Sequence, residues 1–243
     1  MFTVRAAVIV CLCLFCGLAC KAKPAKPAGF ADDTLMSPDK SLPFHKAWHK
    51  PGHDGSKYKL LYVAPVNTSY MLQTTDWQKG ERKDQITKDV ARLGDYAQNA
   101  MKKAFRADKD KRFTVVDDRP NTPDALIFEM ALIEVVPSKV TLNALGYAPF
   151  FVGTALTVVR GLANDVSSTA FEARVRDAAT GEIVAMYADR EQQQTAPISV
   201  RGLTWYSHAE VAISQWAAQF VQLANRKDGQ RIKDSDPFTL MPW

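Results

Sequence analysis

All four cysteines of this 243-residue chain lie near its beginning, between positions 11 and 20, and none follows. Disulfides therefore cannot brace the body of the protein, and its stability must come from a hydrophobic core. The chain is long enough to bury one. Its 47% hydrophobic and 23% charged residues are typical of one globular domain with appendages, which excludes a disordered chain, collagen and a polytopic membrane protein.

The cysteines belong to an N-terminal segment that is typical of a secretory signal. Arg5 is followed by an uncharged apolar run, residues 6–19, which is too short to span a bilayer comfortably. The run leads into Gly-Leu-Ala-Cys at residues 17–20, which resembles a bacterial lipobox, although Gly17 stands where Leu is usual. The resemblance implies that residues 1–19 are a signal peptide and that Cys20 is lipidated. Cleavage elsewhere and an uncleaved anchor are the alternatives.

Acylation would anchor the protein through Cys20, because each buried acyl methylene contributes ~0.8 kcal/mol and two or more chains hold a protein on a membrane stably. Lys21 follows the cysteine, in place of the Asp that such lipoproteins use as an inner-membrane retention signal. In a bacterium with two membranes the resemblance therefore implies the periplasmic face of the outer membrane. Residues 20–30 are rich in lysine and proline, and we expect them to form a lipidated tether near anionic headgroups.

The next part of the chain contains one irregular segment and two regular elements. Residues 31–57 are polar and interrupted by prolines, so we expect them to be irregular. A continuous apolar run, residues 58–66, predicts a strand that is buried on both faces, with Pro65 at its end. In residues 81–105 the apolar side chains recur at steps of three and four, which predicts an amphipathic helix.

Two strands are predicted after this helix, at residues 113–117 and 125–135. In the second strand Glu129 and Glu134 are five residues apart, so they break the alternation of apolar and polar positions. We therefore expect a β-bulge between them.

The clearest hairpin joins residues 169–177 to residues 182–190. Apolar and charged residues alternate along its first strand, and Gly181 in the loop is suited to a positive φ angle. A last helix is predicted over residues 203–225, where apolar side chains again form one stripe. We expect it to pack beside the first helix.

The predicted order of elements is therefore β-α-β-β-β-β-α. This order favours an α/β (α+β) fold, a single sandwich in which two helices cover one face of a mainly antiparallel sheet. The folded domain would comprise residues 58–226, and residues 227–243 would form a C-terminal tail.

Several of these segments together resemble one protein family. They are Cys20, the run Tyr-Lys-Leu-Leu-Tyr-Val-Ala-Pro-Val at 58–66, the sequence Phe-Glu-Ala-Arg-Val-Arg-Asp-Ala-Ala-Thr-Gly-Glu at 171–182, and the helix around Trp216. They are similar to domain of unknown function family 3313, bacterial lipoproteins without an assigned activity, over roughly residues 30–225. These motifs are structural, so the resemblance implies no active-site residues.

Residues 140–159 contain no charged side chain, and two interpretations are open. A transmembrane span fits the length, but glycines, a proline and threonines favour an apolar crossover that packs on the domain or lies against the bilayer. Its exposed residues would form a patch for a partner or a membrane. The candidate contact residues here and in the apolar tail are Phe150, Phe151, Val152, Phe238 and Trp243.

Three histidines are candidate metal ligands. His45, His49 and His53 recur at four-residue intervals beside Asp54, and histidine with carboxylate is a common ligand set. Pro51 and the glycine after it would break the helix needed to align them, so solvated loop histidines are the alternative. We expect no cofactor.

Four carboxylates could serve acid–base catalysis: Asp117, Asp118, Glu129 and Glu134. Neighbouring residues in a strand point to opposite faces, which argues against the first two converging. The sequence contains no nucleophile elbow, no His-Glu-x-x-His and no glycine-rich phosphate loop. His208, at the start of the last helix, is expected in capping or core packing.

These observations favour a membrane-anchored envelope lipoprotein that acts as a non-enzymatic binding or scaffolding module for another envelope protein. An anchored metal-dependent hydrolase and a lipid-binding carrier are the alternatives. A nucleic-acid partner is not expected, because the net charge is only +5 and the predicted domain contains no basic cluster.

Overall fold

Helix α3, Lys83–Arg106, buries one continuous apolar stripe in the computed structural model, which describes residues 22–73, 83–137, 166–194 and 204–235. Its first turn carries Asp84 and its last turn carries Lys103 and Arg106, so these charged side chains interact favourably with the helix dipole. The helix predicted over residues 81–105 is confirmed. The stripe consists of Ile86, Val90, Leu93, Ala97 and Met101.

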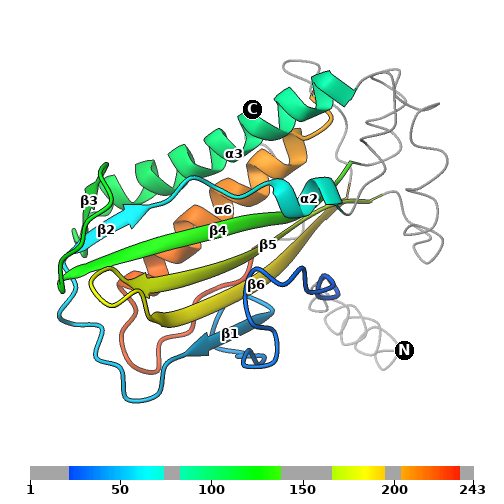
Figure 1. The fold of residues 1–243 in the computed structure, drawn as a ribbon. Helices are drawn as coiled ribbons and strands as arrows, with labels where there is room; N and C mark the ends of the chain where they lie inside the picture. Colours follow the sequence, from blue (N-terminus) through cyan, green and yellow to red (C-terminus); the bar gives the residue numbers. More distant parts are fainter. Residues whose placement is uncertain (1–21, 74–82, 138–165, 195–203, 236–243) are drawn as a thin grey trace, which may run out of the picture.

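Helix α6, Ser207–Ala224, packs beside α3 on the same face of the sheet (Figure 1). Its fully buried Trp216 lies edge-on to Phe171 of the sheet, with ring centroids 4.6 Å apart. Phe220, one turn later, lies 4.7 Å from Phe44, centroid to centroid. Aromatic rings therefore join the helix layer to the sheet, and the predicted pairing of the two helices is confirmed.

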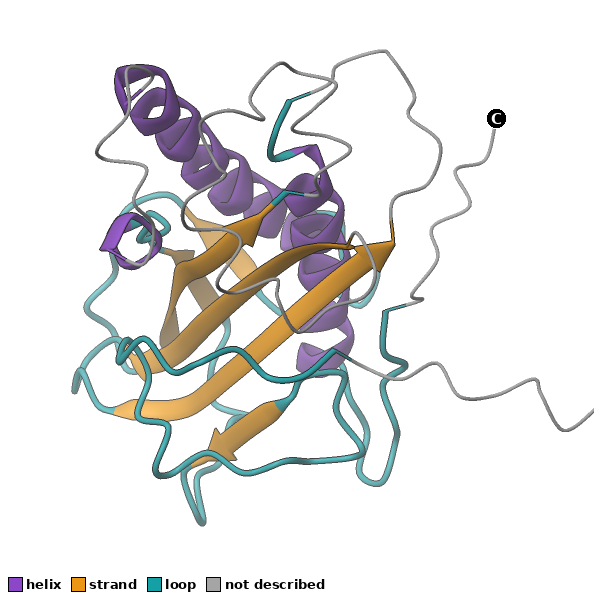
Figure 2. Cartoon of the chain, turned by 90° about the vertical axis from the view of Figure 1, so that its right-hand side faces the viewer, coloured by secondary structure: helices purple, strands orange, loops and turns teal. Residues whose placement is uncertain are grey.

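One six-stranded sheet forms the second layer, in the order β1-β6-β5-β4-β2-β3 (Figures 1 and 2). From β1 to β4 all neighbours are antiparallel, but β2 pairs in parallel with both β4 and β3. The strands are β1 (Lys46–His49), β2 (Leu60–Val63), β3 (Thr114–Val116), β4 (Ala125–Val136), β5 (Val166–Asp177) and β6 (Ile183–Gln194).

The α+β class is confirmed, but the sheet is mixed rather than mainly antiparallel. The physical reason is the long α3 connection, because a helix that crosses over the sheet returns the chain so that β3 runs parallel to β2. The strand predicted over residues 58–66 is also shorter, and β2 is not buried on both faces: Leu61 and Val63 are buried, whereas Leu60 and Tyr62 are half-buried. The long helices cover only one face of the sheet.

Two short elements were not predicted. Strand β1 lies within residues 31–57, which were expected to be irregular, and it pairs with β6 from Lys46↔Ala188 to His49↔Ala185. Helix α2, Ser69–Gln73, follows β2. Both are four or five residues long, and at that length tertiary contacts rather than local pattern decide the structure.

The predicted bulge and hairpin are confirmed. The register of β4 against β5 shifts between Leu132 and Glu134, so Ile133 and Glu134 both lie on the face away from the long helices. The β5–β6 hairpin turns through Gly181, which has a φ of 72°. Phe171 faces the main core.

Among the residues that the structure describes, no helix has the length and hydrophobicity needed to cross a bilayer. The uncharged stretch 140–159 lies outside these residues. So do Cys20, Phe150, Phe151, Val152, Phe238 and Trp243.

Candidate functional site: the strapped face of the sheet

The face of the sheet opposite α3 and α6 is crossed by an N-terminal strap, residues 22–31 (Figure 1). Ala22, Ala25 and Ala28 are half-buried, and the residues between them are exposed. Burial at every third residue is the periodicity of a polyproline II helix, which the two prolines of the strap favour. The exposed residues are Lys23, Pro24, Lys26, Pro27 and Gly29.

Glu172 of β5 holds the strap. Its side chain is on the strap side of the sheet because Phe171, the residue before it, faces the core. Glu172 is only 1% exposed, and its carboxylate accepts hydrogen bonds from the backbone N–H groups of Ala28 (2.6 Å), Phe30 (2.7 Å) and Ala31 (2.9 Å). Hydrogen bonds to an ionised acceptor are among the strong ones, and here they offset the cost of burying a carboxylate.

The Phe30 ring is part of an apolar cluster beside this carboxylate. It packs with Ala131, Ile133 and Ala170, and normal alternation along β4 places both Ala131 and Ile133 on this face. The Arg174 guanidinium lies 4.2 Å from the centroid of the Phe30 ring and donates to the Phe30 carbonyl at 3.0 Å. The strap is therefore an integral part of the fold, although residues 20–30 were expected to form a tether.

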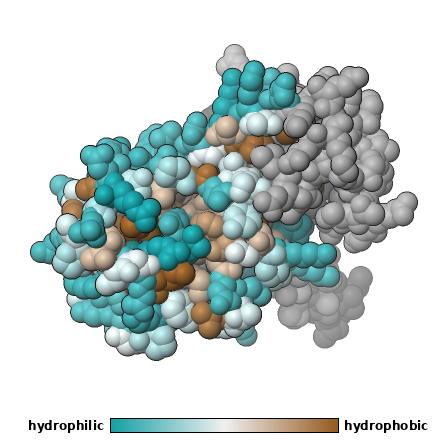
Figure 3. Space-filling view, viewed as in Figure 1, coloured by the Kyte–Doolittle hydropathy of each residue, from teal (hydrophilic) through white to brown (hydrophobic). Residues whose placement is uncertain are grey.

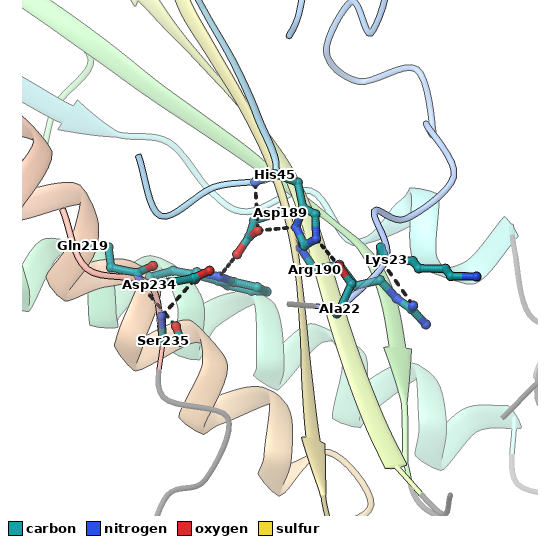
Figure 4. A network of polar contacts seen from close by, with 9 residues as sticks. Ala22, Lys23, His45, Asp189, Arg190, Gln219, Asp234 and Ser235 are labelled. Carbon is teal, nitrogen blue, oxygen red and sulfur yellow. Dashed lines mark hydrogen bonds and ion pairs between the residues drawn. The ribbon is translucent and has the colours of Figure 1, made fainter. Parts of the chain in front are cut away.

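A second polar network joins the start of the strap to the helix layer around the edge of the sheet (Figure 4). Asp189 of β6, which is 2% exposed, accepts hydrogen bonds from the His45 ring Nδ1 (2.5 Å) and from Trp216 Nε1 (2.9 Å). His45 Nε2 contacts the Ala22 carbonyl oxygen. Arg190 reaches the carbonyl of Lys23 at 3.4 Å.

A small cavity lies between the strap and the sheet. Its volume is about 20 Å³, which is enough for one water molecule and far below that of a site for a drug-sized ligand. Its lining is polar as well as apolar, and the polar side chains are Asp33, His45, Lys46, Glu172 and Asp189.

The structure does not bring the three candidate histidines together. His45 bonds to Asp189, whereas His49 Nε2 lies 2.9 Å from the Tyr187 hydroxyl and His53 Nε2 lies 3.0 Å from the Tyr58 hydroxyl. Both ring nitrogens of His45 have contacts within the fold: Nδ1 lies against Asp189 and the Arg190 amide, and Nε2 lies against the Ala22 carbonyl oxygen. Within the described ranges, no three His, Cys, Asp or Glu side chains are grouped so that they could hold a metal.

Three of the four candidate carboxylates are engaged in ion pairs. Asp117 binds Lys102 and Arg106, at 3.1 and 2.8 Å. These two cations hold the pKa of the Asp117 carboxyl below its ordinary value. A general acid needs the opposite shift, and Asp118 beside it is exposed.

The two glutamates of β4 lie on the strap side of the sheet. Burial disfavours the charge of Glu129, but hydrogen bonds from Arg176 and Arg174 outweigh it and lower the pKa of this carboxyl. Glu134 binds Arg190 at 2.7 Å. The carboxylates therefore pair with cations rather than with one another.

A further cluster, which the sequence did not indicate, closes the hairpin end of the sheet. Asp177 accepts hydrogen bonds from the Tyr58 hydroxyl (2.8 Å) and Lys57 Nζ (2.9 Å), and it also bonds the amides of Ala179 and Thr180. Burial and the Asp177 carboxylate raise the pKa of Tyr58 to about 12. Tyr58 is therefore a hydrogen-bond donor at neutral pH and not a nucleophile.

His208 contributes to packing, in agreement with the sequence interpretation. Its Nε2 lies 3.3 Å from the Ser168 carbonyl oxygen, and burial lowers its pKa to about 4. The ring is therefore neutral at pH 7 and donates to this carbonyl.

The fold and the site together define a two-layer α+β protein whose sheet is covered on one face by long helices and on the other by its own N-terminal strap. The chain belongs to the family described as "Protein of unknown function (DUF3313)", which matches residues 26–220. The resemblance of the sequence to this family is thereby confirmed. No curated protein matches the chain.

Among solved structures, the chain is similar to the PelC dodecamer from Paraburkholderia phytofirmans, at 10% identity over 71% of this chain and 93% of that chain, with a TM-score of 0.36. Hypothetical protein CT253 from Chlamydia trachomatis matches at 8% identity over 69% and 95%, with a TM-score of 0.39. Lipoprotein GNA1162 from Neisseria meningitidis matches at 10% identity over 69% and 99%, with a TM-score of 0.32.

Proposed function

We propose that this protein is a bacterial envelope lipoprotein, anchored through Cys20 on the periplasmic face of the outer membrane, and that it binds or scaffolds another envelope protein without catalysing a reaction. The observation that carries the proposal is that the candidate catalytic side chains are bonded to partners within the fold. His45, His49 and His53 bond to fold partners, and Glu129 and Glu134 bond to arginines. Groups held in this way stabilise the structure and are not poised for proton transfer.

The start of the strap supports the anchored part of the proposal. The chain joins the folded body at Ala22, two positions after Cys20, so the lipid would hold the body directly at the membrane. The alternatives have weaker support: the histidines proposed for a hydrolase lie apart, and the cavity beneath the strap admits a water molecule but not an acyl chain.

Anchoring is tested by metabolic labelling with an alkyne fatty acid. We expect the wild type to carry the label and to fractionate with the outer membrane, and we expect Cys20→Ser to do neither. Lys21→Asp is the matched control, because it keeps the acylated cysteine and changes only the sorting residue. A Cys20→Ser protein that is still labelled and membrane-bound would contradict the proposal.

Binding is tested by proximity crosslinking in living cells, followed by mass spectrometry. We expect one envelope protein to be enriched by the anchored wild type and not by Cys20→Ser. Enrichment of no protein by either form, together with hydrolysis of an ester or peptide substrate by the purified protein, would overturn the binding role.

A further inference from the structure

The outward side of the strap carries two positive charges. Lys23 and Lys26 are both exposed and lie three positions apart, which is one turn of a polyproline II helix. They therefore point the same way, and Ala25 between them faces the sheet. The prolines make this segment stiff, so the two lysines hold a fixed position relative to the body.

Of the two acidic residues that follow the strap, one is paired with a cation outside the strap. Asp33 is paired with Lys46 at 2.6 Å, and Asp32 accepts hydrogen bonds from the amide and hydroxyl of Thr34 in a tight turn. The strap lysines have no ion pair with either aspartate among the described contacts. The two strap lysines therefore outnumber Asp32, the one of these two aspartates that has no cation among its described contacts, beside the point where the chain leaves toward Cys20.

An exposed apolar residue lies on the same face. Leu35 is 51% exposed, and it is the only large hydrophobic residue of the described ranges with such exposure. Its neighbour Met36 packs with Ala31 against Met186, on the strap side of β6. Figure 3 shows this side of the molecule with hydrophilic residues over most of its area and smaller hydrophobic spots between them. Such a surface suits contact with polar headgroups rather than deep insertion.

The length of chain between the anchor and the strap sets the distance to the membrane. Two residues span at most roughly 7 Å, at 3.3–3.6 Å each. The headgroup layer of one leaflet is about 5–7 Å thick. A lipid on Cys20 would therefore place Ala22 at the outer limit of that layer.

We propose that the strapped face lies against an anionic bilayer, with Lys23 and Lys26 among the headgroups, Leu35 at the interface, and helices α3 and α6 pointing away. The inference rests on the proposed lipidation of Cys20 and adds the orientation of the body and the class of its partner surface. Basic residues next to a lipid anchor are attracted by anionic headgroups. The opposite orientation would require the start of the strap to leave the sheet, which would break the contacts of the Ala22 carbonyl with His45 and of the Lys23 carbonyl with Arg190.

The orientation is measured with fluorescent labels on the mature, lipidated full chain. The body contains no cysteine, so single substitutions give unique labelling sites. Labels are placed at Lys26→Cys and Leu35→Cys on the strapped face, and at Lys88→Cys on the exposed side of α3. The protein is reconstituted in phosphatidylethanolamine–phosphatidylglycerol vesicles that contain a lipid with a nitroxide on its headgroup.

We expect several-fold stronger quenching at positions 26 and 35 than at position 88. Inserting a flexible Gly–Ser segment after Lys21 should lower this quenching while leaving the fold intact, because the body is then free to leave the surface. Lys23→Glu with Lys26→Glu should also lower quenching at position 35, whereas the control Lys103→Glu with Lys109→Glu should not. Equal quenching at all three positions, or the strongest quenching at position 88, would overturn the orientation.

Flotation of the vesicles separates this inference from the proposed function. A wild type that floats, beside a Cys20→Ser protein that does not, supports the anchor regardless of the quenching pattern. A floating wild type without quenching at positions 26 and 35 overturns the orientation alone. Failure of the wild type to float overturns both.

Discussion

Single carboxylates decide how this protein is held together at the residue scale. Glu172 is buried on the face where apolar side chains would be expected, and three amide groups of the strap compensate for its charge. Asp177 plays the same part at the hairpin, where Tyr58, Lys57 and two amides surround it. Removing either charge therefore leaves polar groups without their partner.

Glu172→Gln is expected to lower the free energy of unfolding by about 1–3 kcal/mol, because an amide keeps the shape but weakens charge-assisted bonds to three N–H groups. The measurement is chemical denaturation of the mature chain carrying Cys20→Ser. The control is Glu182→Gln, whose carboxylate forms a surface ion pair with Lys50 and should change stability by less than about 0.5 kcal/mol. Equal effects of the two substitutions would contradict the role of Glu172.

The environment of Asp177 predicts how the stability of the protein depends on pH. Burial raises the pKa of its carboxyl, but hydrogen bonds from Lys57, the Thr180 amide and Tyr58 outweigh it and hold the pKa well below the ordinary value. Because the pKa is lower in the folded protein, the ionised carboxylate stabilises the fold. This contribution is fully present above the unfolded pKa of about 3.9 and is lost as the pH falls toward the folded pKa.

Asp177→Asn should therefore destabilise the protein at pH 7, and the difference from wild type should shrink below about pH 4. Unfolding curves of both proteins between pH 7 and strongly acidic conditions measure this. If the difference in the free energy of unfolding between the two proteins grew as the pH fell, folding would not lower the pKa of Asp177.

At the scale of elements, the strap behaves as a part of the sheet layer without being a strand. Its amides bond to the Glu172 side chain rather than to a strand backbone, and its alanine side faces β4 and β5. Secondary-structure patterns describe helices and strands, so a segment of this kind is read as a tether. Alanine at every third position, with proline between, is the signal that could have identified its packed side.

Hydrogen–deuterium exchange tests this element. The amides of Ala28, Phe30 and Ala31 should exchange slowly in the wild type and much faster in Glu172→Gln, because the side chain is their only acceptor among the described bonds. Amides in the middle of α3 should exchange equally in both proteins. Rapid exchange of the three strap amides in the wild type would show that the strap is not docked.

For the whole molecule, the sequence predicted the parts that depend on local periodicity. Both long helices, the β4 bulge and the β5–β6 hairpin follow from the spacing of apolar and charged residues. The parallel pairing of β2, the edge strand β1 and the Glu172 site depend instead on residues far apart in the chain. The sequence indicated His45 only as a candidate metal ligand, and its contacts with Asp189 and Ala22 could not be predicted from spacing.

The core alone should sustain the folded molecule. Because no cysteine follows position 20, a reducing agent should leave the midpoint of thermal unfolding unchanged in the Cys20→Ser protein. The measurement is circular dichroism with and without dithiothreitol. A shifted midpoint would point to a covalent effect that this sequence does not provide.

The strap also fixes an order of events during biogenesis. It is synthesised among the first residues, yet Glu172, Asp189 and Trp216, which hold it, lie in the last third of the chain. If the protein is exported as proposed, the N-terminal segment would stay undocked until these residues have followed it across the membrane. Under the proposed lipidation, Cys20 would therefore be accessible to processing enzymes during that interval, and folding would later draw the modified end against the body.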